Sequence, residues 1–159
     1  MAPAFIIPLE QIDINKVIFD AKAIEQVNPH RFEMRHLDGI LLFKPEQGLI
    51  ASYKDIRTDE FWVRGHIPGR PLFPGVLMIE AAAQLVSFYY KSTDGKNDPR
   101  FFGFGGVDKV KFRSTIVPGD KLIVMGKCVE MRSRRVTFDT QGAVNGKLAF
   151  EATITGMAV

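Results

Sequence analysis

The stretch of sequence that decides the fold is "GHIPGRPLFPGVLMIEAAAQ", residues 65–84. Its first half is dense in proline and glycine, which fix the path of a loop. Its second half is a long apolar run interrupted by one carboxylate, Glu80. Burying an ionised carboxylate costs several kcal/mol unless the group is paired or protonated. Glu80 is therefore expected either to have a compensating partner or to serve a chemical step.

The apolar run predicts one long helix over residues 76–90, with Pro74-Gly75 before its start and Asp94-Gly95 after its end. A helix that is apolar on nearly all faces is a buried one. Its few polar positions fall on a single stripe: Glu80, Gln84, Ser87 and, just beyond the run, Lys91.

Most of the remaining sequence has the pattern of β-strands. Residues 40–53 are predicted to form a hairpin around a turn at 44–48. Asn145-Gly146 lies between two alternating runs and is a strong signal for a tight hairpin turn, because both positions of that turn need a positive φ. The later strand-like runs are 101–117, 121–131, 134–144 and 147–159. Together these patterns predict an α+β fold in which an antiparallel sheet of about six strands wraps around the helix.

Length and composition indicate a soluble globular protein. The chain has 159 residues, 46% of them hydrophobic and 25% charged, and a formal net charge of +3. This weak positive charge does not indicate a nucleic-acid partner. We expect an N-terminal arm over residues 1–27, in which 10–18 has an amphipathic pattern, followed by one domain over residues 28–159.

Compartment signals agree with one another. The single cysteine, Cys128, lies in an apolar run and is expected to pack in the core, as is usual in a reducing compartment. The first twenty residues carry acidic groups early and lack the pattern of a secretory signal, and no apolar run has the length of a membrane span. The sequence therefore predicts a cytoplasmic protein.

His66 is the first candidate for a catalytic side chain, because the prolines and glycines around it would hold its imidazole in place. On local sequence alone, a loop histidine without a task is an equally good interpretation. Glu80 favours the catalytic one. Desolvation on a buried helix favours the neutral carboxyl group, and a histidine with such a carboxyl group forms an acid–base pair.

The stretch 65–84 resembles the signature of the hot-dog-fold 3-hydroxyacyl-[acyl-carrier-protein] dehydratases. "NPHRF" (28–32), "FGGVDKVKFRSTIVPGDKLIV" (104–124) and "NGKLAFEA" (145–152) fit the same family, so the likeness covers about residues 28–156. The resemblance implies a hot-dog fold and the dehydration of 3-hydroxyacyl thioesters to trans-2-enoyl thioesters in fatty-acid biosynthesis. It implies no cofactor and no metal.

The resemblance also assigns roles to residues. His66 would be the general base that removes the proton from C2 of the thioester, and Glu80 the general acid that protonates the departing hydroxyl group. The backbone N–H of Gly75 would face the thioester carbonyl, and the carbonyl of Leu72 would orient the imidazole. In this family the histidine and the glutamate meet across a dimer interface, which implies a homodimer or a trimer of dimers, with acyl carrier protein delivering the substrate.

The sequence departs from the family pattern at several positions. After "NPHRF" it continues as "EMRHLDGI", with Arg35, His36 and Asp38, and position 67 is isoleucine where phenylalanine is usual. These departures leave the pair His66 and Glu80 intact and concern the acyl substrate. The alternative functions are a hot-dog acyl thioesterase and a non-catalytic acyl-thioester-binding paralogue.

Three further groups of residues have two interpretations each. Gln84 is expected to orient Glu80 or to satisfy buried backbone groups. The aromatic residues of 101–104 would line an acyl tunnel or pack in the core: Phe101, Phe102 and Phe104. His30 and His36 have no spacing typical of metal ligands.

After Gln84 and the aromatic residues, a basic strand face is the third group with two interpretations. Lys109, Lys111 and Arg113 alternate with apolar residues and are predicted to share one face of a strand. They would form a docking patch for an acidic carrier protein, together with Arg132, Arg134 and Arg135, or a simple solvated face.

Overall fold

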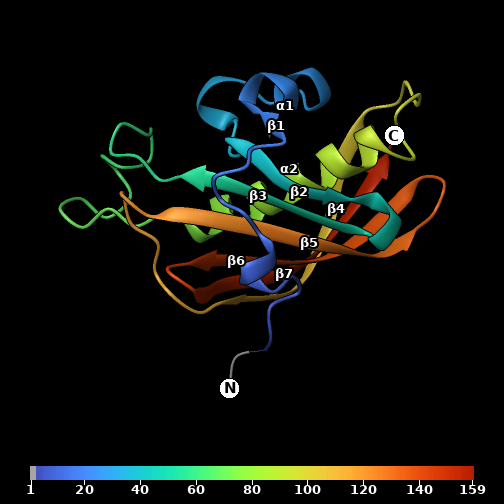
Figure 1. Cartoon of the computed structure of the whole chain (residues 1–159). Helices are drawn as coiled ribbons and strands as arrows, with labels where there is room; N and C mark the ends of the chain where they lie inside the picture. Colours follow the sequence, from blue (N-terminus) through green and yellow to red (C-terminus); the bar gives the residue numbers. More distant parts are fainter. Residues whose placement is uncertain (1–2) are drawn as a thin grey trace.

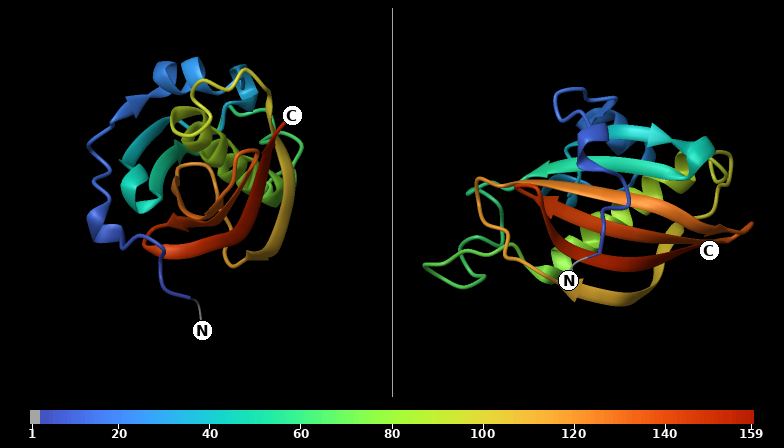
Figure 2. Two further views of the ribbon diagram at one scale, coloured as in Figure 1. Left: turned by 90° about the vertical axis from the view of Figure 1, so that its right-hand side faces the viewer. Right: turned by 60° about the horizontal axis from the view of Figure 1, so that its bottom comes forward.

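One antiparallel sheet curls around the long helix α2 (Gly75–Ser92) in this computed structural model, which describes residues 3–159 (Figures 1 and 2). The strand order is β1-β2-β3-β5-β6-β7-β4. The strands are β1 (Phe19–Asp20), β2 (Gly39–Lys44), β3 (Leu49–Asp55), β4 (Phe102–Phe112), β5 (Lys121–Met131), β6 (Arg135–Val144) and β7 (Lys147–Ala158). The α+β fold predicted from the sequence is confirmed, with seven strands instead of about six. No helix in residues 3–159 is long and apolar enough to cross a membrane.

Helix α2 forms the centre of the core. It begins at Gly75, directly after Pro74, its residues 84–90 are buried, and the helix packs mainly against β5, β6 and β7. The polar stripe is not uniformly buried, however. Gln84 and Ser87 are buried, whereas Glu80 and Lys91 are half-buried. The prediction of a buried helix therefore holds for residues 84–90, whereas Glu80 on the same stripe is only half-buried.

The two predicted hairpins are confirmed. β2 and β3 are joined through a 3-10 turn at Pro45–Gln47 that ends at Gly48, whose φ is 70°. β6 and β7 are joined at Asn145 and Gly146, with φ values of 53° and 76°. Both φ values are positive, as the tight hairpin turn requires.

The N-terminal segment differs from the expectation. The predicted amphipathic segment 10–18 contains only the end of a 3-10 turn at Leu9–Gln11, and the helix of this region is α1 (Ala21–Val27). The Asp20 carboxylate caps α1 by accepting a 2.9 Å hydrogen bond from the N–H of Ala23. Residues 3–18 cross the outer face of the sheet (Figure 1), where Ile7 and Ile12 are buried.

Strand β4 forms one edge of the sheet, since β7 is its sole neighbour among the described strands. An edge strand of this length with apolar side chains in the open is unusual for a monomer. The exposed apolar residues on or beside it are Phe101, Phe104, Val107 and Phe112.

Candidate active site

His66 lies in the loop of residues 56–74, which projects beyond one end of the sheet (Figure 2). Its backbone N–H donates a 2.8 Å hydrogen bond to the carbonyl of Trp62. Its ring Nδ1 lies 2.6 Å from the carbonyl oxygen of Leu72, the group to which the resemblance assigns the orientation of the imidazole. Because a carbonyl can only accept, this contact places the ring proton on Nδ1. Nε2 is then left with a lone pair that can take up a proton.

Gly75 is the first residue of α2, and its N–H belongs to the first turn, where backbone donors have no partner within the helix. The helix dipole adds partial positive charge there. A Cβ at this position would lie 2.8 Å from the ring of Phe112, so a side chain would displace that ring. At Gly75, a backbone N–H without a helical partner thus lies where strand β4 comes close to the helix.

Glu80 lies five residues further along α2, about one and a half turns, with 24% of its side chain exposed. Its Oε1 accepts a 3.1 Å hydrogen bond from Nε2 of Gln84. The same oxygen lies 3.7 Å from Nε2 of His30. The carboxyl group therefore has two neighbours within its own chain.

Gln84 has a single possible amide orientation. Its Oε1 accepts from the N–H of His36 at 2.9 Å, and its Nε2 donates to the carbonyl of Met34 at 2.7 Å. These two backbone partners fix Nε2 on the side that faces Glu80. Gln84 thus satisfies buried backbone groups and contacts the carboxyl group at the same time, so both roles considered for it occur.

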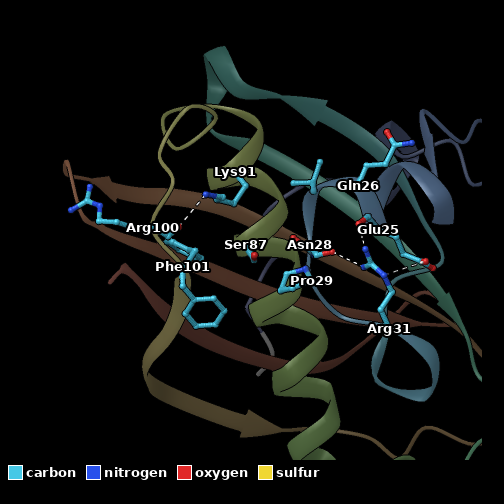
Figure 3. Close-up of a pocket in the computed structure, with 11 residues that line it drawn as sticks. Glu25, Gln26, Asn28, Pro29, Arg31, Ser87, Lys91, Arg100 and Phe101 are labelled. Atoms are coloured by element: carbon cyan, nitrogen blue, oxygen red, sulfur yellow. Dashed lines mark hydrogen bonds and ion pairs between the residues drawn. The ribbon is translucent and has the colours of Figure 1, made fainter.

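A cavity of about 140 Å³ opens beside Glu80. The residues that line it are His30, Glu80, Ala83, Val86, Ser87, Phe101, Phe102, Phe104, Ile154 and Gly156. The three aromatic residues singled out in the sequence thus lie at this cavity, and Phe102 also stacks on Tyr90 in the core at 4.5 Å. Through Ser87 and two of the phenylalanines the cavity adjoins a second one of about 300 Å³, where Lys91, Arg100 and Phe101 stand on one side and Asn28 and Arg31 on the other (Figure 3).

His30 lies in the family-like segment "NPHRF" and lacks the spacing of a metal ligand, so the sequence assigns it no role. Burial lowers the pKa of its imidazole, and this effect outweighs the opposing influence of Glu80. Its Nδ1 is buried without a hydrogen-bond partner. Among residues 3–159 no hydrogen bond or ion pair joins His66 to Glu80, so one chain alone brings His30, and not His66, to the carboxyl group. The sequence feature that points to His30 is the resemblance of the "NPHRF" segment to the dehydratase family.

The basic residues form two separate groups. Lys109 has a φ of 53° within a bulge of β4, and Arg113 forms a 2.5 Å ion pair with Glu151 on β7. Lys111 lies opposite Glu151, whereas Arg135 lies opposite Met157. Glu151 and Met157 are six residues apart on β7, which corresponds to about 20 Å. The group on β4 and the arginines of the β5–β6 turn therefore do not form one patch.

Comparison with solved structures identifies the fold. The chain aligns with the dehydratase heterocomplex ApeI:P from Xenorhabdus doucetiae with a TM-score of 0.73 and 12% identity, covering 86% of this chain and 90% of that one. It aligns with a hypothetical thioesterase protein with coenzyme A from Streptococcus pneumoniae TIGR4 with a TM-score of 0.58 and 13% identity, over 76% and 84% of the two chains. At these identities the likeness concerns the fold alone, and it confirms the hot-dog fold.

Sequence comparison identifies the family. Residues 28–153 match the FabA-like domain. The chain is 35% identical over 138 residues to the 3-hydroxyacyl-[acyl-carrier-protein] dehydratase FabZ of Streptococcus gordonii, covering 87% of this chain and 96% of that protein. It is 36% identical over 138 residues to the bifunctional enzyme LpxC/FabZ of Chlorobaculum tepidum, of which it spans 29%. The chain belongs to the FabA-like domain family and, within it, to the FabZ-type 3-hydroxyacyl-[acyl-carrier-protein] dehydratases.

Proposed function

We propose that this chain dehydrates 3-hydroxyacyl thioesters carried by acyl carrier protein to trans-2-enoyl thioesters, as a cytoplasmic enzyme of fatty-acid biosynthesis. The observation that carries the proposal is the contact between Nδ1 of His66 and the carbonyl of Leu72. It leaves Nε2 as a proton acceptor in an exposed loop next to the start of α2. A carboxyl group at an apolar cavity supplies the matching acid.

The reaction proceeds through two proton transfers. Nε2 of His66 takes the proton from C2, and the electrons of that bond move toward the thioester carbonyl. The N–H of Gly75 stabilises the negative charge that develops on the carbonyl oxygen, assisted by the helix dipole. The C3–O bond then breaks while Glu80 donates its proton, and the hydroxyl group leaves as water. The proposal involves no cofactor and no metal.

Gln84 determines which oxygen of Glu80 carries the transferred proton. Because Nε2 of Gln84 donates to Oε1, that oxygen acts as an acceptor. Oε2 is then the oxygen left free to carry the transferred proton. Gln84 thus serves as a positioning residue, and it is held in place by the backbone of residues 34 and 36.

The site is completed by a second copy of the chain. Glu80 and the exposed Phe104 line one cavity, and Phe104 belongs to the edge strand β4. A partner that pairs with β4 would cover its exposed apolar side chains and close this cavity. We propose that such a homodimer brings His66 of one protomer to Glu80 of the other. Assembly into a trimer of dimers stays a prediction.

The carrier protein is proposed to dock on the basic residues of β4, Lys109 and Lys111 with Arg113. Support comes from the exposure of both lysines. An acidic carrier protein is the partner that this basic face would attract, and such an encounter is steered by charge.

The proposed function is tested by incubating the protein with 3-hydroxyacyl thioesters of graded length, linked to acyl carrier protein or to coenzyme A. Enoyl product and free thiol are measured in parallel. We expect enoyl product without free thiol, and faster turnover of the carrier-linked form. Release of free thiol would instead identify a thioesterase, and binding without product would identify a non-catalytic paralogue.

A further inference from the structure

Lys54 and Glu60 form a buried ion pair beneath the loop that carries His66. Lys54 is at the end of β3 and Glu60 near the start of the loop, and Nζ lies 2.7 Å from Oε1. The two side chains are 2% and 6% exposed. Because each buried charge loses its hydration, such a pair contributes little net stability compared with apolar residues of similar size. A geometric role therefore accounts for the pair better than a stabilising one does.

The carboxylate of Glu60 joins three segments of backbone and side chain. Oε1 accepts from Nζ of Lys54 and, at 3.1 Å, from the indole N–H of Trp62. Oε2 accepts a 2.7 Å hydrogen bond from the backbone N–H of Arg57. Burial alone would raise the pKa of Glu60, but these hydrogen bonds outweigh burial and hold it below its usual value. The carboxylate thus stays ionised and keeps the end of β3, the loop start and Trp62 together.

Both hydrogen bonds that hold His66 are connected to the Lys54–Glu60 ion pair. Its backbone N–H is bonded to the carbonyl of Trp62, whose indole is held by Glu60. Its ring is bonded to the carbonyl of Leu72, and the next residue, Phe73, packs edge-on against Trp62 at 5.4 Å. Nζ of Lys54 lies 5.8 Å from the centre of the Phe73 ring.

The rest of the loop offers the imidazole little support. Residues 64–70 are all exposed, and Ile67 and Gly69 have positive φ values of 62° and 82°. A histidine in such a segment depends on its two hydrogen bonds for its position. We propose that the Lys54–Glu60 ion pair is a positioning device that holds the His66 imidazole in its catalytic orientation, an inference that rests on the proposed function of His66.

The test compares the variant Glu60→Gln with Asp59→Asn. Glu60→Gln keeps the shape of the side chain and removes its charge. Asp59 forms an exposed ion pair with Arg57 in the same loop, at 2.9 Å with side chains 75% and 51% exposed, and provides the matched control. Steady-state kinetics with a 3-hydroxyacyl thioester gives kcat and KM separately. The chain has three histidines and therefore three imidazole Cε1–H signals. The NMR signal of His66 among them reports a change in the position of its ring.

We expect Glu60→Gln to lower kcat about 10–100-fold with KM changed less than about threefold, because small displacements of a catalytic group slow the chemical step. The His66 signal should shift or broaden. Asp59→Asn should leave kcat, KM and the His66 signal unchanged. A Glu60→Gln protein that is folded and retains wild-type kcat and an unchanged His66 signal would overturn the inference.

A second variant separates positioning from stability. In Lys54→Met/Glu60→Met both charges are replaced together, so no unpaired charge is buried and cooperative unfolding should be retained. We expect the same fall in kcat and the same change in the His66 signal; wild-type values for both would contradict the inference. If the wild-type protein does not dehydrate thioesters, the proposed function fails, whereas the NMR comparison still decides whether the ion pair positions His66.

Discussion

Within one chain the carboxyl group of Glu80 faces His30, with 3.7 Å between Oε1 and Nε2. His66 reaches no such contact, and its ring is held by Leu72 instead. Two histidines are therefore candidates for the base: His30 within the chain, and His66 from a second copy. The orphaned Nδ1 of His30 is buried, whereas the contact of His66 leaves a basic nitrogen in the open. This difference favours His66.

Substitution of the two histidines distinguishes these candidates. His66→Gln should lower kcat for dehydration by about 10²–10⁴, as removal of a general base typically does. His30→Gln should lower it by about tenfold or less, since the glutamine still fills the space beside Glu80. Steady-state assays of both variants, with circular dichroism as a control for folding, measure this. The reverse order of losses would make His30 the base.

The buried His36 predicts a dependence of stability on pH. Burial, with a smaller contribution from Lys54, lowers the pKa of His36 from 6.5 to about 4. Between these values the unfolded chain binds a proton that the folded protein does not, so stability falls as the pH decreases from about 6.5 to about 4. A shift of this size corresponds to about 3 kcal/mol in total.

The contribution of His36 is isolated by comparison with His36→Leu. Both ring nitrogens of His36 lack hydrogen-bond partners, so leucine removes the titration without breaking a side-chain hydrogen bond. In urea unfolding at a series of pH values, the variant should lose less stability than the wild type between pH 6.5 and 4. Parallel pH dependences of the two proteins would show that His36 is not the titrating group.

The N-terminal residues are predicted to stabilise the domain by covering the outer face of the sheet. Ile7 is 1% exposed and packs in a cluster with Leu42, Ala51 and Met125, whereas Ile14 is 49% exposed. Ile7→Ala should therefore cost about 2–5 kcal/mol of unfolding free energy, and Ile14→Ala much less. Equal effects in chemical denaturation would mean that the segment does not pack on the sheet in solution.

Charge reversal tests the proposed carrier-docking surface. Lys109→Glu/Lys111→Glu should raise KM for the carrier-linked substrate, and added salt should weaken wild-type binding, because exposed charges are screened within about 8–10 Å at physiological salt. Turnover of a short carrier-free thioester should change little. Arg100→Glu, beside the second cavity, is the matched control; a larger effect there would move the docking surface to that end of the sheet.

The sequence predicted the elements whose signals are local. The run 76–90 and the pair Asn145-Gly146 each determine a helix or a turn through their own chemistry, and both predictions are confirmed. The helix α1 was missed because seven residues are too short for a periodic pattern to stand out, and its stability comes from Asp20 and from packing.

The environment of the candidate site depends on contacts between distant segments. Residues 30 and 80 meet because the "NPHRF" segment packs along α2, which no pattern within either segment encodes. Lys54 and Glu60 likewise lie in the charged stretch "YKDIRTDE", which is typical of a solvated surface loop. In the structure both side chains are nevertheless buried. The contacts of His66 with Leu72 and of Glu80 with Gln84 could thus be anticipated from the sequence, whereas the approach of His30 and the buried Lys54–Glu60 pair could not.

The central claim is that each active site combines His66 of one protomer with Glu80 of another, and mixing two inactive variants tests it most directly. His66→Ala and Glu80→Gln proteins are each expected to be nearly inactive. After subunit exchange, confirmed by native mass spectrometry, some mixed dimers contain one intact site, so dehydration of a 3-hydroxyacyl thioester should recover toward about a quarter of the wild-type rate per protomer in an equimolar mixture if exchange is random. Mixed dimers that form and remain as inactive as the separate variants would contradict the shared site.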